Sequence, residues 1–139
     1  MLMLDQWLAP RAGFAPVLVR LAVGVVAVLH GWPKLINLSG FFGKLRLLGI
    51  PLPELFGTAA ALSEFLGGLC LVVGFVTRQA AFSIACVMAV AVFRVHWKGG
   101  FFAEAGGYEY PLVLLVASIS LIVSGSGPLS IDRLRKGKR

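Results

Sequence analysis

Glu64 lies in the middle of a long apolar stretch, where an ionisable side chain is costly. The stretch covers residues 54–76, and at about 1.5 Å per residue it is long enough to cross a bilayer core of about 30 Å. A carboxylate at that depth usually faces a partner or a water-filled cavity rather than lipid. Ala60, Gly67 and Gly68 share its helical face, and small residues let neighbouring helices approach closely. We therefore predict that Glu64 points into the centre of a helical bundle.

Other polar residues are expected at a similar height in the membrane. Counted from the inner face at about 1.5 Å per residue, Glu64 lies at about 18 Å, His30 at about 21 Å and Arg94 at about 22 Å. We predict that these residues meet in the outer half of the bundle. The candidates for ligand binding in this region are Lys34, Arg94, His96, Glu109 and Tyr110.

Two interpretations of Glu64 follow from this placement. In the structural one, Arg94 or His30 neutralises the carboxylate, and the pair holds the helices together. In the functional one, a polar pocket open to the outside holds a quinone headgroup or passes a proton. His30 and Glu64 are then a hypothetical catalytic proton relay, since small shifts move the pKa of a histidine across the working range. Arg20, only about 6 Å from the inner face, lies too low to join the site. It either pairs inside the bundle or, at lower cost, extends to that face.

The composition indicates a membrane protein. Of the 139 residues, 58% are hydrophobic and only 14% are charged, whereas soluble domains carry about 25% charged residues. The mean hydropathy is +0.90. The net charge is +7, and five of the thirteen basic residues lie in the last seven positions. Beside a membrane segment, such a tail indicates which side of the membrane it faces, and it indicates contact with anionic lipid. We expect no nucleic-acid partner.

Four membrane helices are predicted, which form one all-α domain, an integral membrane four-helix bundle. Pro16 suits the first turn of the first helix, and Pro33 is expected to end or kink it. A loop or interfacial segment with a short amphipathic helix follows. The predicted helices span residues 16–33, 54–76, 79–97 and 108–124, and a basic tail covers residues 132–139.

The basic residues also predict the orientation. With four spans both termini share a side, and that side holds eight bases: Arg11, Arg20, Arg78 and the five of the tail. The other side holds five: Lys34, Lys44, Arg46, Arg94 and Lys98. The positive-inside rule therefore predicts cytoplasmic termini.

An ordered set of short motifs runs through these elements. They are HGWPK at residues 30–34, EFLGG at 64–68, GFVTR at 74–78, YEY at 108–110 and GSGPLSID at 125–132. In this order they resemble the DoxX family of small four-helix membrane proteins, over roughly residues 20–132. The family motifs carry over here to Lys34, Glu64 and Glu109, and in second place to Arg20 and His96. The resemblance makes residues 1–139 a single DoxX-like domain.

The resemblance implies a multi-pass protein of the bacterial inner membrane. The family is named after a subunit of a thiosulfate:quinone oxidoreductase, so it implies a subunit or accessory factor in quinone-linked redox or redox-stress protection. A quinone is then the expected cofactor, and haem is not expected because the chain lacks a CxxCH motif. The expected partners are the lipid bilayer, membrane or soluble redox subunits and further copies of the chain. The alternative is a non-enzymatic assembly, transport or scaffold subunit of the membrane.

Overall fold

A computed structural model describes residues 2–137 and is helical throughout its regular elements. Four helices form the bundle: α2 (Ala15–Ile36), α4 (Pro53–Val73), α5 (Thr77–Val90) and α6 (Glu109–Ser124). Three apolar helical stretches are long enough to cross a membrane, and α6 is a shorter apolar helix. The predicted all-α membrane bundle is confirmed.

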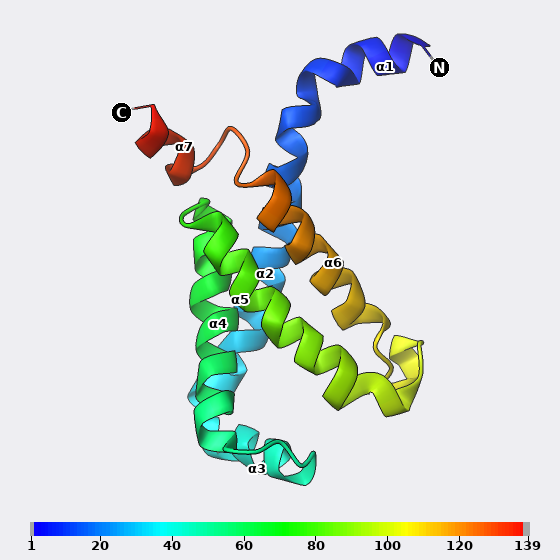
Figure 1. Cartoon of the computed structure of the whole chain (residues 1–139), viewed down its shortest axis with the longest axis vertical. Helices are drawn as coiled ribbons and strands as arrows, with labels where there is room; N and C mark the ends of the chain where they lie inside the picture. Colours follow the sequence, from blue (N-terminus) through cyan, green and yellow to red (C-terminus); the bar gives the residue numbers. More distant parts are fainter. Residues whose placement is uncertain (1, 138–139) are drawn as a thin grey trace.

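The two ends of the bundle differ (Figure 1). Both ends of the chain and the turn between α4 and α5 lie at one end, which we call the terminal end. The opposite end, which we call the loop end, carries α3 (Leu38–Leu47) and the loop between α5 and α6. At the terminal end, α1 (Leu2–Leu8) bends away from the bundle, and the short helix α7 (Ile131–Lys136) follows α6.

The core is made of small and aliphatic side chains from all four helices. Its buried members are Val23, Ala27, Leu71, Ala80, Ala81, Ile84, Met88 and Leu121. Helices α2 and α4 approach closely where Gly24 and Gly68 face each other. A Cβ atom on Gly68 would lie 2.8 Å from the carbonyl oxygen of Gly24, closer than any side chain could sit. Backbone contact of this kind is typical of membrane helices with small residues in their interface.

Of the two expected effects of Pro33, an end or a kink, the structure contradicts the first. α2 continues through Pro33 to Ile36. Proline lacks only one donor N–H, and membrane helices tolerate this because packing and neighbouring groups compensate for the freed carbonyl. As a result Lys34 is held on the last turn of the helix, four residues after His30 and on the same face.

The other boundaries also differ from those expected. α4 ends at Val73 rather than at residue 76, because Gly74 adopts a left-handed conformation with φ of 70°. The third span is not a uniform α-helix. After Val90 it continues as a π-helical segment (Ala91–His96) and a 3-10 turn (Trp97–Gly99).

Arg20 is buried inside the bundle, which is the costlier of its two expected placements. Its residue surface is only 3% exposed, and its guanidinium donates hydrogen bonds to backbone carbonyls. The N···O distances are 2.8 Å to Leu71, 2.6 Å to Val72 and 3.0 Å to Ser126, and a further bond goes to Leu129. Two of these carbonyls belong to the last turn of α4, where no intrahelical donor remains. Burial of the guanidinium is therefore tolerated, because its planar set of N–H donors is hydrogen-bonded to several carbonyl oxygens.

Candidate functional site

A cavity of about 320 Å³ opens between α2, α4, α5, α6 and the loop before α6. Its polar lining consists of His30, Lys34, Glu64, His96 and Tyr110, and its apolar walls include Val23, Ile84, Met88 and Leu114. Five of the seven sequence-predicted site residues therefore border one cavity. Small-molecule sites are usually of this kind, apolar with a few convergent polar groups.

The carboxylate of Glu64 is the most buried polar group of the cavity. The residue is 1% exposed, and Lys34 donates a hydrogen bond from its ammonium to Oε2 across the α2–α4 interface. The expected partners of Glu64 were Arg94 or His30, and Lys34 takes that role. The reason is the continuation of α2 past Pro33, which brings the long lysine side chain level with the carboxylate.

Gly31 lets α2 and α4 meet at this pair. A Cβ atom at Gly31 would lie 2.5 Å from the backbone nitrogen of Phe65 and 3.0 Å from the Cβ of Glu64. No larger residue fits without moving the two backbones apart. The close approach of α2 therefore sets the distance over which Lys34 reaches Glu64.

His30 and Tyr110 place two rings at the cavity from opposite helices. Their ring centroids are 5.9 Å apart, with an interplanar angle of 37°. His30 is on the same face of α2 as Lys34, and Tyr110 is in the first turn of α6. Tyr110 is 43% exposed, so one edge of the cavity is open to the surroundings of the bundle.

His96 closes the cavity at the loop end. It is the last residue of the π-helical segment, a type of helix that often occurs at functional sites. Its Nδ1 lies 2.9 Å from the carbonyl oxygen of Gly106. Since a carbonyl only accepts, Nδ1 carries the proton in this contact. The hydrogen bond holds the loop over the cavity and leaves Nε2 for a ligand.

Arg94 and Glu109 do not line the cavity. The side chain of Arg94 is exposed on the outside of the bundle, since its height along the helix does not determine the direction in which it points. Oε2 of Glu109 accepts a hydrogen bond of 3.0 Å from the backbone N–H of Ala103. Glu109 therefore stabilises the loop before α6.

The loop between α5 and α6 is the part of the site that the sequence did not predict. Ala103, Gly106 and Gly107 line the cavity with backbone and small side chains. A Cβ atom at Gly107 would lie 2.3 Å from the carbonyl oxygen of Gly100, so the tight fold of the loop needs glycine there. Two adjacent glycines before the YEY motif were a signal of a compact turn but not of a cavity wall.

The arrangement can bind a polar ring and exchange protons with it. Lys34 is a cationic hydrogen-bond donor. His30 and Glu64 are groups that can take up or release a proton. Among the described residues, no three His, Cys, Asp or Glu side chains gather as a set of metal ligands would. The residues able to hold a ligand are therefore the five polar ones of the cavity.

The family profile that matches this chain is DoxX, over residues 15–97. The matched part contains α2, α4 and α5, the Lys34–Glu64 pair, His30 and His96. The chain belongs to the DoxX family. Its membership explains the bundle of apolar helices and makes the chain a multi-pass protein of the inner membrane.

Several curated proteins of this kind are similar over most of their length. A Bacillus subtilis protein named "Putative oxidoreductase CatD" is 31% identical over 88% of both chains. An uncharacterized protein of Haemophilus influenzae is 30% identical over 82% of this chain and 85% of its own. The inner membrane protein YphA of Escherichia coli is 27% identical over 84% and 86%. No solved structure shows a significant match to the chain.

Proposed function

We propose that this DoxX-family protein binds a quinone and acts as a subunit or accessory factor in quinone-linked redox chemistry or protection against redox stress. The observation that carries the proposal is the cavity in which Lys34, Glu64 and His30 face apolar walls. The similarity to a protein named as an oxidoreductase supports the same class of activity.

A quinone headgroup matches the chemistry of this cavity. It is a flat ring with two carbonyl oxygens, so it needs hydrogen-bond donors at its edge and apolar contacts on its faces. Lys34 and His30 supply donors, while Ile84 and Met88 supply apolar surface. A volume of about 320 Å³ is near the lower limit for small-molecule sites, which suits one ring with its isoprenoid tail outside, along the helices.

The residues of the cavity would handle the protons of the reaction. Reduction of a quinone to a quinol consumes two electrons and two protons. In this proposal His30 and Glu64 are a relay: each takes up a proton from the water outside the cavity and passes it to a ring oxygen, so that two protons reach the quinol. Lys34 orients the Glu64 carboxylate. The electrons come from a redox partner protein in or beside the membrane. Arg94 and Glu109 have no part in ligand binding in this scheme, and His96 acts by holding the loop.

We also propose that both termini are cytoplasmic. The excess of basic residues at the terminal end supports this orientation. The cavity at the loop end would then lie in the outer half of the membrane. A partner on the outer side, or a quinone that enters from the lipid, would reach it there.

The test is the ligand content of the full chain purified in a mild detergent. An organic extract with close to one quinone per protein supports the proposal. An extract without quinone, together with a stable non-redox partner protein, favours the assembly or scaffold role instead. An absorbance spectrum of the same sample, with or without a haem band, separates a quinone site from a haem site.

A further inference from the structure

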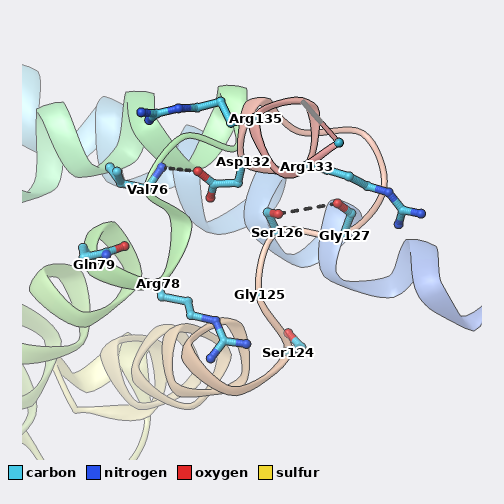
Figure 2. A pocket seen from close by; sticks show the side chains of 11 residues that line it. Val76, Arg78, Gln79, Ser124, Gly125, Ser126, Gly127, Asp132, Arg133 and Arg135 are labelled. Atoms are coloured by element: carbon cyan, nitrogen blue, oxygen red, sulfur yellow. Dashed lines mark hydrogen bonds between the residues drawn. The ribbon is translucent and has the colours of Figure 1, made fainter. Parts of the chain in front are cut away.

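A second, larger pocket lies at the terminal end of the bundle, away from the quinone cavity. It has a volume of about 1040 Å³ and lies between the start of α5, the segment after α6 and α7. Figure 2 shows it from close by. Its lining is polar and basic: Val76, Arg78, Gln79, Ser124, Gly125, Ser126, Gly127, Asp132, Arg133, Arg135 and Gly137.

Three arginines border this pocket from different sides. Arg78 lies beside Gly125 and Ser124, while Arg133 and Arg135 extend to opposite sides of Asp132 (Figure 2). All three are exposed residues. Among the residues that the structure describes, Arg78 makes one hydrogen bond, of 3.2 Å, to the carbonyl oxygen of Val123. Its remaining guanidinium donors are available to an anion.

The one acidic residue of the pocket is already engaged with the backbone. Asp132 accepts hydrogen bonds from the N–H groups of Val76 at 2.8 Å and Thr77 at 2.9 Å, one on each carboxylate oxygen. Its charge is therefore directed to the start of α5, where backbone donors lack helical partners. Three arginines against this one carboxylate leave the pocket lining with a net positive charge.

Apolar residues stand next to the basic ones. Phe75, Leu129 and Leu134 are exposed, at 37%, 64% and 70%. Each is adjacent or close in sequence to a residue that lines the pocket. Arg135 also lies over the ring of Phe75, at 5.6 Å from its centroid. An occupant with both an anionic head and apolar chains would satisfy both sets of residues.

We propose that this pocket binds the phosphodiester headgroup of an anionic phospholipid, with the acyl chains against the neighbouring apolar side chains. Basic pockets between membrane helices are the places where anionic lipid headgroups bind. Arginine is suited to the task because its planar donors match phosphate oxygens. The site anchors the segment from Gly125 to α7 against the membrane surface and is independent of the quinone cavity.

Native mass spectrometry of the full chain in a neutral detergent tests the proposal. The probes are phosphatidylglycerol, phosphatidylcholine with the same acyl chains, and inorganic phosphate. We expect the protein to retain phosphatidylglycerol in preference to phosphatidylcholine, and inorganic phosphate not to displace it. Arg78→Gln should weaken phosphatidylglycerol binding about fivefold, and Arg78→Gln combined with Arg133→Gln and Arg135→Gln more than tenfold.

Two further variants keep the test decisive. Arg11→Gln removes one exposed arginine at the same end of the chain but outside the pocket, and should bind like the wild type. Arg78→Lys keeps the charge and should retain most of the binding. If the triple variant does not fold, phosphatidylglycerol binding by the single variants Arg78→Gln, Arg78→Lys and Arg11→Gln decides the test.

Several results would overturn the proposal. They are equal retention of the two lipids, unchanged binding by the pocket variants, or equal losses in Arg11→Gln and Arg78→Gln. Displacement of the lipid by inorganic phosphate would also overturn it, because the site would then take a free ion.

Discussion

Lys34 on the last turn of α2 donates a hydrogen bond to the carboxylate of Glu64 in the middle of α4. The glutamate side chain is 2% exposed and the lysine side chain 26%, so the pair joins the interior of the bundle to the cavity. A buried carboxylate needs such a partner, because an isolated charge in a medium of low polarity is costly. The pair thus contributes both to the packing of α2 on α4 and to the chemistry of the cavity.

Glu64→Ala should lower the free energy of unfolding by on the order of 2 kcal/mol, because it leaves Lys34 without its acceptor and opens a hole in the core. Glu64→Gln should cost less, since its amide oxygen still accepts from Lys34 in nearly the same volume. Thermal unfolding of the purified variants in detergent measures both effects.

The exposed pair of Arg46 and Glu54 provides the control. Its side chains are 60% and 57% exposed, and exposed pairs contribute about 0–1 kcal/mol. Glu54→Gln should therefore leave the unfolding midpoint nearly unchanged. Equal losses from Glu54→Gln and Glu64→Ala would mean that the buried pair has no special role in stability.

Gly31→Ala should weaken the contact between α2 and α4. The new Cβ atom would meet the backbone of Phe65 at 2.5 Å, and a backbone cannot rotate away as a side chain can. We expect a loss of about 1–3 kcal/mol, as for other overpacked sites, together with a looser Lys34–Glu64 contact. Gly43→Ala is the matched control, since nothing lies within 4 Å of the added atom. A loss in Gly43→Ala as large as in Gly31→Ala would contradict this account.

The sequence predicted the bundle and the polar residues of the cavity lining, because both follow from hydrophobic length, small-residue faces and polar residues at matching height. It did not predict the apolar walls or the loop residues of the cavity. It did not predict the partner of Glu64. Pro33 is a strong signal for the end of a helix in water, and only packing in the bundle shows that α2 continues. The height of a residue in the membrane also does not determine the direction of its side chain. Arg94 is therefore expected in the cavity from its height, but it lies outside.

Arg20 illustrates a second limit of prediction from the sequence. Its burial depends on carbonyl oxygens of Leu71, Val72, Ser126 and Leu129, which come from two segments far apart in the chain. No local pattern shows that a turn and a helix end will present acceptors to one guanidinium. The free-energy cost of burying a guanidinium is predictable from the sequence, but the hydrogen bonds that compensate for it depend on tertiary structure.

Asp132 should make the stability of the terminal end depend on pH. Burial alone would raise the pKa of its carboxyl, but hydrogen bonds from the backbone of Thr77 and Val76 and the charge of Arg135 together hold the pKa below its ordinary value. A carboxyl whose pKa is lowered by folding stabilises the protein above its unfolded pKa of about 3.9. That contribution is lost as the pH falls through the folded pKa.

Asp132→Asn should therefore be less stable than the wild type at pH 7, by up to about 1 kcal/mol, because the amide has one acceptor oxygen in place of two and lacks the negative charge that stabilises a helix N-terminus. The difference should begin to shrink as the pH falls below about 4, the pKa of the carboxyl in the unfolded chain, and should disappear as the pH falls through the lower folded pKa. Thermal unfolding of both proteins between pH 7 and pH 3 measures it. A difference that stays constant over this range would contradict the role of the Asp132 charge.

The proposed orientation predicts which residues are accessible from outside the cell. In a background with Cys70→Ala and Cys86→Ala, a membrane-impermeant maleimide should label Lys44→Cys at the loop end of intact cells. It should leave Arg78→Cys at the terminal end unlabelled until the membrane is opened. The reverse pattern would place the termini outside and the quinone cavity in the inner half of the membrane.

The affinity of the purified protein for a short-chain quinone, determined by isothermal titration calorimetry for the wild type, Glu64→Gln and Glu54→Gln, tests the central proposal most directly. Glu64→Gln removes the charge and the exchangeable proton at the cavity with little change in volume, whereas Glu54→Gln alters an exposed carboxylate of the same helix. We predict saturable binding by the wild type and by Glu54→Gln, and binding about tenfold weaker in Glu64→Gln. The neutral amide holds the Lys34 ammonium less firmly at the quinone than the carboxylate does, since a hydrogen bond between charged groups contributes about 1.5–3 kcal/mol and a neutral one about 1 kcal/mol. No binding by the wild type, or equal affinity in all three proteins, would contradict it.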